Sequence, residues 1–136
     1  MGQYDIYADD PQRAMAFYAA VFRWSFLRRR GSDSWWVSSG PITAPQIDGL
    51  LKKRIAGERG HLGALHVAAF DVVVERIRAH GGRLITPIRA GMRDERQLYA
   101  IDPEGNSFRL IEVIAAPILS LPIPMRLPAS MLAVTA

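Results

Sequence analysis

The chain has 136 residues, the size of one ordinary domain, and its lack of cysteine excludes disulfides, thiolate metal sites and a cysteine nucleophile. The formal net charge of +4 includes basic runs at residues 28–30 and 52–54. Runs of this kind more often keep a surface hydrated than bind phosphates, so we expect no nucleic-acid partner. The absence of a signal peptide and of an apolar run long enough to span a membrane predicts a cytoplasmic protein without a membrane partner.

The first half of the chain predicts a strand, a helix and three further strands. Residues 3–7 alternate in polarity, as a half-exposed strand does. Asp10 and Pro11 are typical of a helix start, with an N-cap followed by proline at the first helical position. The apolar residues that follow recur at helical spacing, which indicates a helix near residues 10–23 that lies on a sheet. Strands separated by turns rich in Gly, Ser and Pro are then predicted at residues 24–27, 34–39 and 47–54.

The second half repeats this order. Residues 61–69 are a predicted strand, and Asp71 is the predicted cap of a helix near residues 71–80. The glycine pair at residues 81–82 ends that helix. Three more strands are predicted at residues 83–87, 96–101 and 107–114.

This duplication predicts an α+β fold made of two βαβββ modules, at residues 1–54 and 61–113. Neither module can bury its sheet face alone. We therefore expect the two to pair as one domain, with mixed β-sheet around a cleft and the helices on the outer faces.

Residues 114–136 contain four prolines and one charged residue, and the other side chains are mainly apolar. The prolines exclude a regular helix through the middle of the segment, and a solvated disordered tail would be more polar. We expect a C-terminal arm that covers an open sheet of its own domain or of a partner, with a poorly ordered end as the alternative.

Residues 102–106 read Asp-Pro-Glu-Gly-Asn, in which proline presets one turn position, glycine supplies a positive φ, and the Asp and Asn side chains bond to local backbone. With apolar and aromatic strands on both sides, they predict a β-hairpin. This hairpin resembles the last hairpin of the vicinal oxygen chelate superfamily, which includes glyoxalase I, bleomycin-resistance proteins and extradiol dioxygenases. Residues 8–24 and 77–82 resemble its first helix and the end of its second helix, with Arg23 in place of a usual glycine.

The resemblance implies four metal-ligand positions on the first and last strands of the modules. Three of them fall on Gln3, Leu62 and Arg109. The fourth lies near Asp48. A leucine cannot ligate, a glutamine is a poor ligand, and a guanidinium repels a divalent cation. His61 cannot replace Leu62 on a regular strand, because adjacent side chains point to opposite faces. We therefore expect no metal site, no other cofactor and no stoichiometric divalent metal in the purified protein.

Strand parity predicts which side chains face the cleft. The residues that share the side of the ligand positions are Gln3, Asp5, Leu62, Ala64, His66, Ser107 and Arg109. Tyr99 is expected to join them, and so is Trp35 or Trp36, because adjacent residues on a strand face opposite ways and one of the two must point inward. From this set, the candidate ligand-binding residues are Gln3, Asp5, Trp36, His66, Tyr99 and Arg109. An arginine beside aromatic rings in an apolar concavity suits a planar or anionic small molecule. In the alternative arrangement, Arg109 pairs with Asp5 and closes the cleft.

Three functions are consistent with this pattern. The first is a metal-free protein of the bleomycin-resistance kind that binds a small organic ligand, anionic or aromatic, in the inter-module cleft; no catalytic residue is assigned. The second is an enzyme of the same superfamily, either a metal-dependent lyase, isomerase or dioxygenase, or a metal-free enzyme with His66 or Tyr99 as acid–base group. The third is an interaction module with a vestigial cleft. The resemblance also implies a homodimer.

Overall fold

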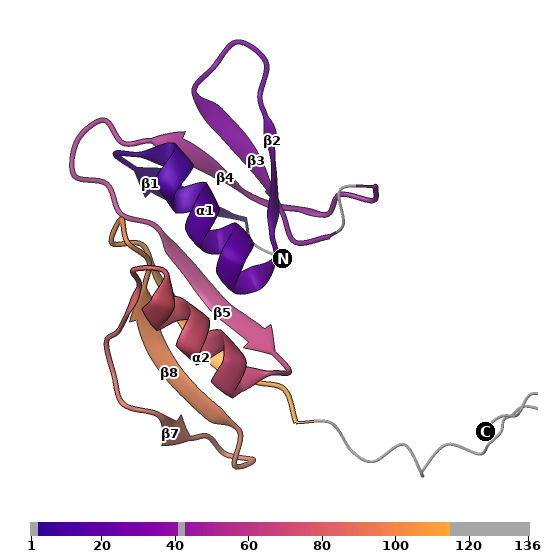
Figure 1. The fold of residues 1–136 in the computed structure, drawn as a ribbon, viewed down its shortest axis with the longest axis vertical. Coiled ribbons are helices and arrows are strands. Elements are labelled where there is room, and N and C mark those ends of the chain that lie inside the picture. Colours follow the sequence, from indigo (N-terminus) through magenta and orange to yellow (C-terminus); the bar gives the residue numbers. More distant parts are fainter. Residues whose placement is uncertain (1–2, 41–42, 115–136) are drawn as a thin grey trace, which may run out of the picture.

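The computed structural model describes residues 3–40 and 43–114, and it contains two mixed β-sheets, each covered by one helix (Figure 1). Both helices lie on the same side of the molecule, and within residues 3–40 and 43–114 no helix covers the opposite face of either sheet. The predicted α+β fold of two related modules is confirmed. The predicted C-terminal arm falls almost wholly on residues 115–136, which lie outside the described residues.

The first module runs β1 (Tyr4–Ala8), α1 (Pro11–Phe22), β2 (Ser25–Arg28), β3 (Ser34–Ser38) and β4 (Ile47–Lys53). Its strand order is β1-β4-β3-β2. The β1 and β4 strands are parallel, whereas β3 is antiparallel to both of its neighbours. The helix begins as its sequence predicts, because the Asp10 side chain accepts a hydrogen bond from the backbone N–H of Arg13 at 3.2 Å.

The second module runs β5 (His61–Val67), α2 (Phe70–Ala79), β6 (Arg83–Leu84), β7 (Arg89–Ala90), β8 (Arg96–Ile101) and β9 (Ser107–Glu112). Its strand order is β5-β9-β8-β6, and the short β7 also pairs with β8.

The strand predicted at residues 83–87 is only two residues long. The backbone N–H groups of Ile85 and Thr86 both donate to the carbonyl oxygen of Tyr99, which interrupts the regular ladder, and Pro87 has no N–H to donate. The sequence analysis did not predict β7.

The start of α2 also differs from the expected one. The helix begins at Phe70 with Ala69 at the N-cap position and no side-chain cap, so the prediction of Asp71 as the cap is wrong. Asp71 lies inside the first turn, where its carboxylate accepts hydrogen bonds from the Arg96 guanidinium at 2.8 and 3.2 Å. The carboxylate is thus bonded to the end of a neighbouring strand and not to the helix backbone.

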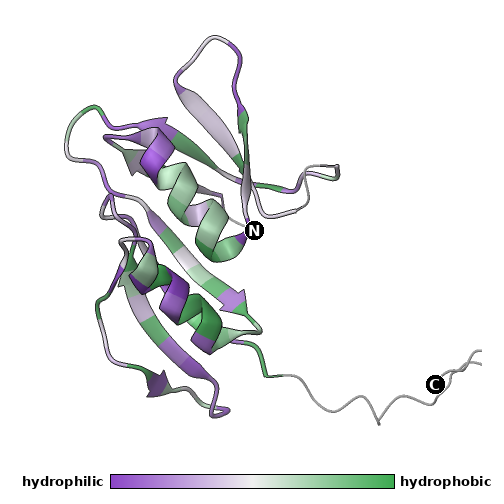
Figure 2. Ribbon diagram, in the orientation of Figure 1, coloured by the Kyte–Doolittle hydropathy of each residue, from purple (hydrophilic) through white to green (hydrophobic). Residues whose placement is uncertain are grey.

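The hydrophobic core lies between the helices and the sheets and continues across the two modules. Figure 2 shows α2 with separate hydrophobic and hydrophilic bands, as expected for a helix with one buried side. The ring of Phe22 in α1 meets that of Phe108 in β9 edge to face, with centroids 5.6 Å apart. In the described part of the chain, neither helix has the length and hydrophobicity needed to cross a bilayer.

The predicted turn at residues 102–106 forms and also joins the modules. Asn106, which is fully buried, accepts hydrogen bonds from the N–H groups of Tyr7 (3.0 Å) and Gly60 (2.7 Å). Its amide group donates to the Tyr7 carbonyl oxygen and to Asp102, at 2.8 and 2.9 Å. Burial raises the pKa of Asp102, although the Tyr18 hydroxyl donates to its carboxylate at 2.7 Å. The last hairpin of the second module is therefore bonded to the first strand of the first.

Candidate ligand-binding site

Two hollows adjoin at Ala64 of β5. The first, which we call the Arg109 hollow, has a volume of about 350 Å³ and is lined chiefly by His61, Gly63, Ala64, Tyr99, Ser107 and Arg109. The second, the junction hollow, has a volume of about 520 Å³ and is lined by both modules. The single cleft expected from the sequence is thus divided into two parts.

Arg109 lies on β9 between two neighbours that the strand register fixes. Ala64 of β5 is its partner on one side and Tyr99 of β8 on the other. The Arg109 side chain is half-buried, and it forms no ion pair within residues 3–40 and 43–114. Tyr99 is 46% exposed, so its ring is available for stacking. An unpaired guanidinium beside an accessible ring can bind a carboxylate or another oxyanion.

The alternative pairing of Arg109 with Asp5 is wrong. The Asp5 carboxylate lies 3.4 Å from the ammonium group of Lys52 and accepts from the Tyr7 hydroxyl at 3.4 Å. Tyr7 and Lys52 are register partners on the parallel strands β1 and β4. Because these three side chains share one face of the first sheet, Asp5 is neutralised within its own module and Arg109 is left without it.

The first strand of the second module contains a β-bulge that affects two predictions of side-chain direction. His61 pairs with Ser107, but the next paired residue, Ala64, pairs with Arg109, so β5 has one more residue than β9 over this span. Gly63 provides the positive φ, +82°. Leu62, predicted to face the cleft, is only 7% exposed and packs in the core, where it borders the junction hollow and not the Arg109 hollow. His61, predicted to point away, lines the Arg109 hollow.

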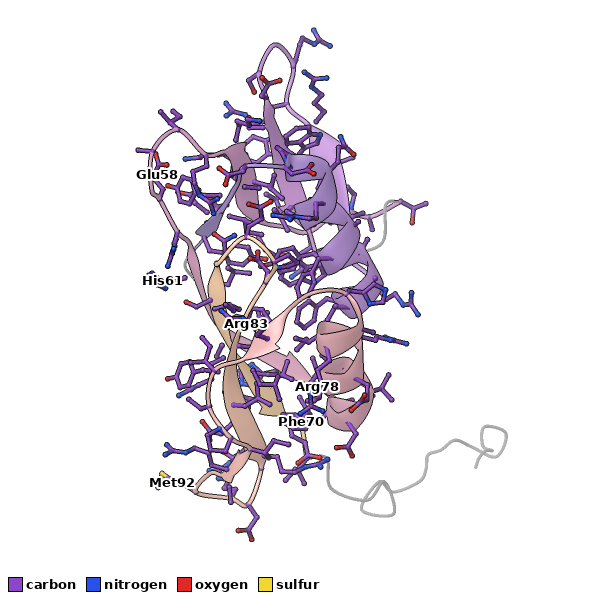
Figure 3. The ribbon with its side chains drawn as sticks, turned by 60° about the vertical axis from the view of Figure 1, so that its left-hand side comes forward. Glu58, His61, Phe70, Arg78, Arg83 and Met92 are labelled. Carbon is purple, nitrogen blue, oxygen red and sulfur yellow. The ribbon has the colours of Figure 1, made fainter. Side chains whose placement is uncertain are left out.

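His61 and Ser107 contact each other directly at the open end of the Arg109 hollow. The distance between His61 Nδ1 and Ser107 Oγ is 2.6 Å. Figure 3 shows His61 on the side of the molecule away from the helix that carries Phe70 and Arg78. The strand pattern alone missed His61 because it assumes a regular strand. An isolated glycine inside a predicted strand is the signal that could have found it.

Other predicted site residues lie elsewhere. Gln3 and His66 line the junction hollow and not the Arg109 hollow. Trp36 is 37% exposed on the open face of the first sheet, where the Arg29 guanidinium lies 5.1 Å from the ring centroid. The structure therefore brings Tyr99 and Arg109 together in the Arg109 hollow, where it adds His61. It brings Gln3 and His66 together in the junction hollow.

The junction hollow is mainly apolar and aromatic. Tyr4 and Trp24 stack there with ring centroids 5.9 Å apart. Burial, and then the nearby Asp48, raise the pKa of the Tyr4 hydroxyl far above its usual value. The Asp48 carboxylate is bonded to the backbone N–H of Ser39 at 2.8 Å. This hollow offers room for an apolar body next to the charged end of the Arg109 hollow.

A protein-family model described as a glyoxalase-like domain matches residues 4–111. The chain belongs to this glyoxalase-like family. It is thereby a member of the vicinal oxygen chelate superfamily, as the resemblance of its turn and helices predicts. Among curated protein sequences, none matches the chain significantly.

Solved structures with the same fold include the fosfomycin resistance protein FosX from Mesorhizobium loti. Its sequence is 18% identical, the match covers 84% of this chain and 92% of FosX, and the TM-score is 0.62. TioX from Micromonospora sp. has 18% identity, covering 81% of this chain and 95% of that one, with a TM-score of 0.60. A glyoxalase I mutant from Zea mays has 20% identity, covering 85% of this chain but 46% of that one, with a TM-score of 0.64. At these identities the likeness shows the fold alone.

The donor groups of this glyoxalase-like chain do not fit a divalent metal. In the part of the chain that the structure describes, no three His, Asp or Glu side chains come close enough to hold one. His61 is bonded to Ser107 in one hollow, while His66 lines the other. The guanidinium of Arg109 belongs to the first of these hollows and would repel a cation there.

The bulge provides a direct test of this local geometry. Gly63→Ala is expected to lower the free energy of unfolding by about 1–2 kcal/mol, because a left-handed backbone is strained for alanine. No heavy atom lies within 4 Å of the added Cβ, so steric collision contributes nothing. Gly57→Ala is the matched control. At Gly57, too, no heavy atom lies within 4 Å of an added Cβ, but the backbone does not have a positive φ. Urea denaturation measures both, and equal stability of the two variants would contradict the bulge.

Proposed function

We propose that this glyoxalase-like protein binds a small organic anion, without a metal, in the Arg109 hollow. One observation carries the proposal: the half-buried Arg109 has no carboxylate partner within the described residues, although the expected partner, Asp5, is in the same protein. A guanidinium in a hollow binds a carboxylate with two parallel hydrogen bonds. Tyr99, its register partner on β8, supports the planar part of such a ligand.

The junction hollow supports a larger ligand. Because the two hollows share Ala64, a molecule bound at Arg109 has its apolar portion directed over β5 toward Trp24 and Tyr4. A ligand with an anionic head and an apolar or aromatic body thus matches both hollows. The homodimer implied by the family resemblance remains part of this proposal.

The other two hypotheses are less well supported. His66 as the acid–base group is not favoured, because it lines the junction hollow and not the Arg109 hollow, in which the anion would bind. For Tyr99, the position beside Arg109 supports a role in holding the ligand. A vestigial cleft filled by side chains does not agree with hollows of about 350 and 520 Å³.

The proposal predicts a specific loss of binding. We expect 4-carbamoylbenzoate, a planar carboxylate, to bind more tightly than benzamide, which lacks the charge. Arg109→Leu should weaken binding of the carboxylate by about 1.5–3 kcal/mol, the range for hydrogen bonds to charged groups, and leave benzamide unchanged. Isothermal titration calorimetry or ligand-observed NMR measures both.

The matched control is Arg89→Leu, which removes an exposed arginine that does not line the hollow. Unchanged affinity for the carboxylate in Arg109→Leu, with the fold intact by circular dichroism, would refute the anion site.

A further inference from the structure

We propose that Ser107 and His61 form a nucleophile–base pair that accepts acyl groups from esters whose acyl part carries a carboxylate. The inference rests on the proposed function, because Arg109 is the group that holds that carboxylate. The 2.6 Å contact between His61 Nδ1 and Ser107 Oγ has the geometry in which an imidazole activates a serine hydroxyl.

Both side chains are attached to well-fixed backbone. His61 and Ser107 are register partners on neighbouring strands, and the N–H of Ser107 donates to the carbonyl oxygen of Gly60 at 2.9 Å. The preceding residue, Asn106, is fully buried, and its side chain makes four hydrogen bonds. Catalytic groups held on strands in this way keep their mutual geometry, whereas groups on loops do not.

The chemistry proceeds in two steps that balance. In the tautomer with its proton on Nε2, His61 accepts the Ser107 hydroxyl proton at Nδ1 while Oγ forms a bond to the ester carbonyl carbon. The bond to the leaving oxygen breaks, and the proton on His61 passes to that oxygen to release an alcohol. Water then attacks the acyl-serine, its proton passes through His61 to Ser107 Oγ, and the carboxylic acid leaves.

The position of Arg109 defines the substrate class. It follows Ser107 by two residues on the same face of β9, about 7 Å along the strand. A carboxylate held by Arg109 therefore places an ester carbonyl at Ser107 when the two groups are separated by a short spacer or a single ring. The expected substrates are half-esters of compact dicarboxylic acids.

The pair lacks the third member of a catalytic triad. Among the described residues that line the Arg109 hollow, none is a carboxylate that could orient His61. An imidazole without this partner is a weaker base, and with an ester whose leaving group is a stable phenolate the attack of water depends on that base more than the first step does. We therefore expect the acyl-serine to accumulate, with one rapid release of alcohol per chain and slow turnover afterwards.

Mono-4-nitrophenyl terephthalate tests this inference, because its para carboxylate cannot attack its own ester. We expect a burst of about one 4-nitrophenolate per chain and an added terephthaloyl group on Ser107 by peptide mass spectrometry. The neutral 4-nitrophenyl benzoate should react at least about 10-fold more slowly. His61→Gln should slow the burst roughly 100-fold or more, the contribution of a general base.

The controls separate this inference from the proposed function. Ser107→Ala should abolish the burst and the adduct, while Ser32→Ala, which removes a hydroxyl of the first module, should change neither. Arg109→Leu should remove the preference for the charged ester. A burst that survives Ser107→Ala, or no acyl-serine in a protein that still binds 4-carbamoylbenzoate, would overturn the nucleophile–base pair alone. No binding of 4-carbamoylbenzoate would overturn both proposals.

Discussion

Asn106→Ala is expected to lower the free energy of unfolding by about 3–5 kcal/mol, because a buried backbone group that loses its hydrogen-bond partner costs about 1–3 kcal/mol. The substitution removes the side-chain acceptor of two such groups, the N–H groups of Tyr7 and Gly60, and one of two donors to the Tyr7 carbonyl oxygen, which also accepts from Arg54 at 3.1 Å. Two of these groups belong to the first module, so the loss weakens the contact between the halves as well as the turn.

Urea denaturation monitored by tryptophan fluorescence measures this loss. Gln12→Ala, an exposed substitution on α1, is the control and should change stability by less than about 0.5 kcal/mol. Asn106→Asp is a second variant of nearly the same shape that keeps the acceptor oxygens but places a second carboxyl beside Asp102. We expect it to be destabilising as well. A loss below about 1 kcal/mol in the alanine variant would contradict the role of this residue as a joint.

Glu104→Gln is expected to cost about 3–4 kcal/mol at neutral pH. The Glu104 side chain is 1% exposed, and its carboxylate lies 2.8 Å from the Arg13 guanidinium and 3.2 Å from that of Arg54. It also accepts the N–H groups of Asp9 and Asp10, at the start of α1, at 2.9 and 3.1 Å. An amide cannot accept all of these donors, and the substitution removes charge-assisted hydrogen bonds at a buried carboxylate, although Arg13 is 55% exposed and Arg54 keeps the Asp9 carboxylate at 2.9 Å.

The same variant should change how stability depends on pH. Burial tends to raise the pKa of Glu104, but hydrogen bonds from the Asp9 N–H and the Arg13 side chain outweigh burial, and the net pKa is lowered. A carboxyl whose pKa is lower in the folded state stabilises the protein above the unfolded-state pKa, about 4.3, and this contribution is lost as the pH falls through the folded-state pKa. The stability difference between wild type and Glu104→Gln should therefore be full at pH 7 and shrink in acid.

Denaturation midpoints at pH 7, 5 and 3 test this expectation. Glu75→Gln breaks an exposed ion pair with Arg78 and should cost less than about 0.5 kcal/mol at every pH. A difference between wild type and Glu104→Gln that stays constant from pH 7 to pH 3 would show that the charge of Glu104 is not what stabilises the joint.

The features predicted correctly from the sequence are those that depend on a few neighbouring residues. The Asp10–Pro11 helix start, the glycine end of α2 and the turn at residues 102–106 are all local, and each forms as predicted. Their order along the chain was sufficient to predict the fold, because two modules of this kind can bury the apolar faces of their sheets in only a few arrangements.

The features that were missed depend on contacts between distant residues or on a single irregularity. One extra residue at Gly63 shifts the side chains before it on β5, so parity wrongly pointed His61 away from the cleft, whereas His61 lines the Arg109 hollow. The alternative ion pair of Asp5 with Arg109 does not form, because Asp5 pairs instead with Lys52, 47 residues away in the sequence but on the neighbouring strand. A regular alternating pattern of polar and apolar residues predicts neither the bulge nor this ion pair.

The joint at residues 102–106 makes the duplicated halves of the molecule unequal. Its side chains bond to the first strand and to the first helix of the other half. Between the last two strands of the first half, residues 39–46 read Ser-Gly-Pro-Ile-Thr-Ala-Pro-Gln, which contains no copy of the joint sequence. The halves are therefore not interchangeable. A chain assembled from two copies of the first half would lack the hydrogen bonds and ion pairs by which this turn fastens one half to the other. Any graft of the second half must bring with it a matching Arg13 and Arg54, whereas Tyr7 contributes only backbone groups.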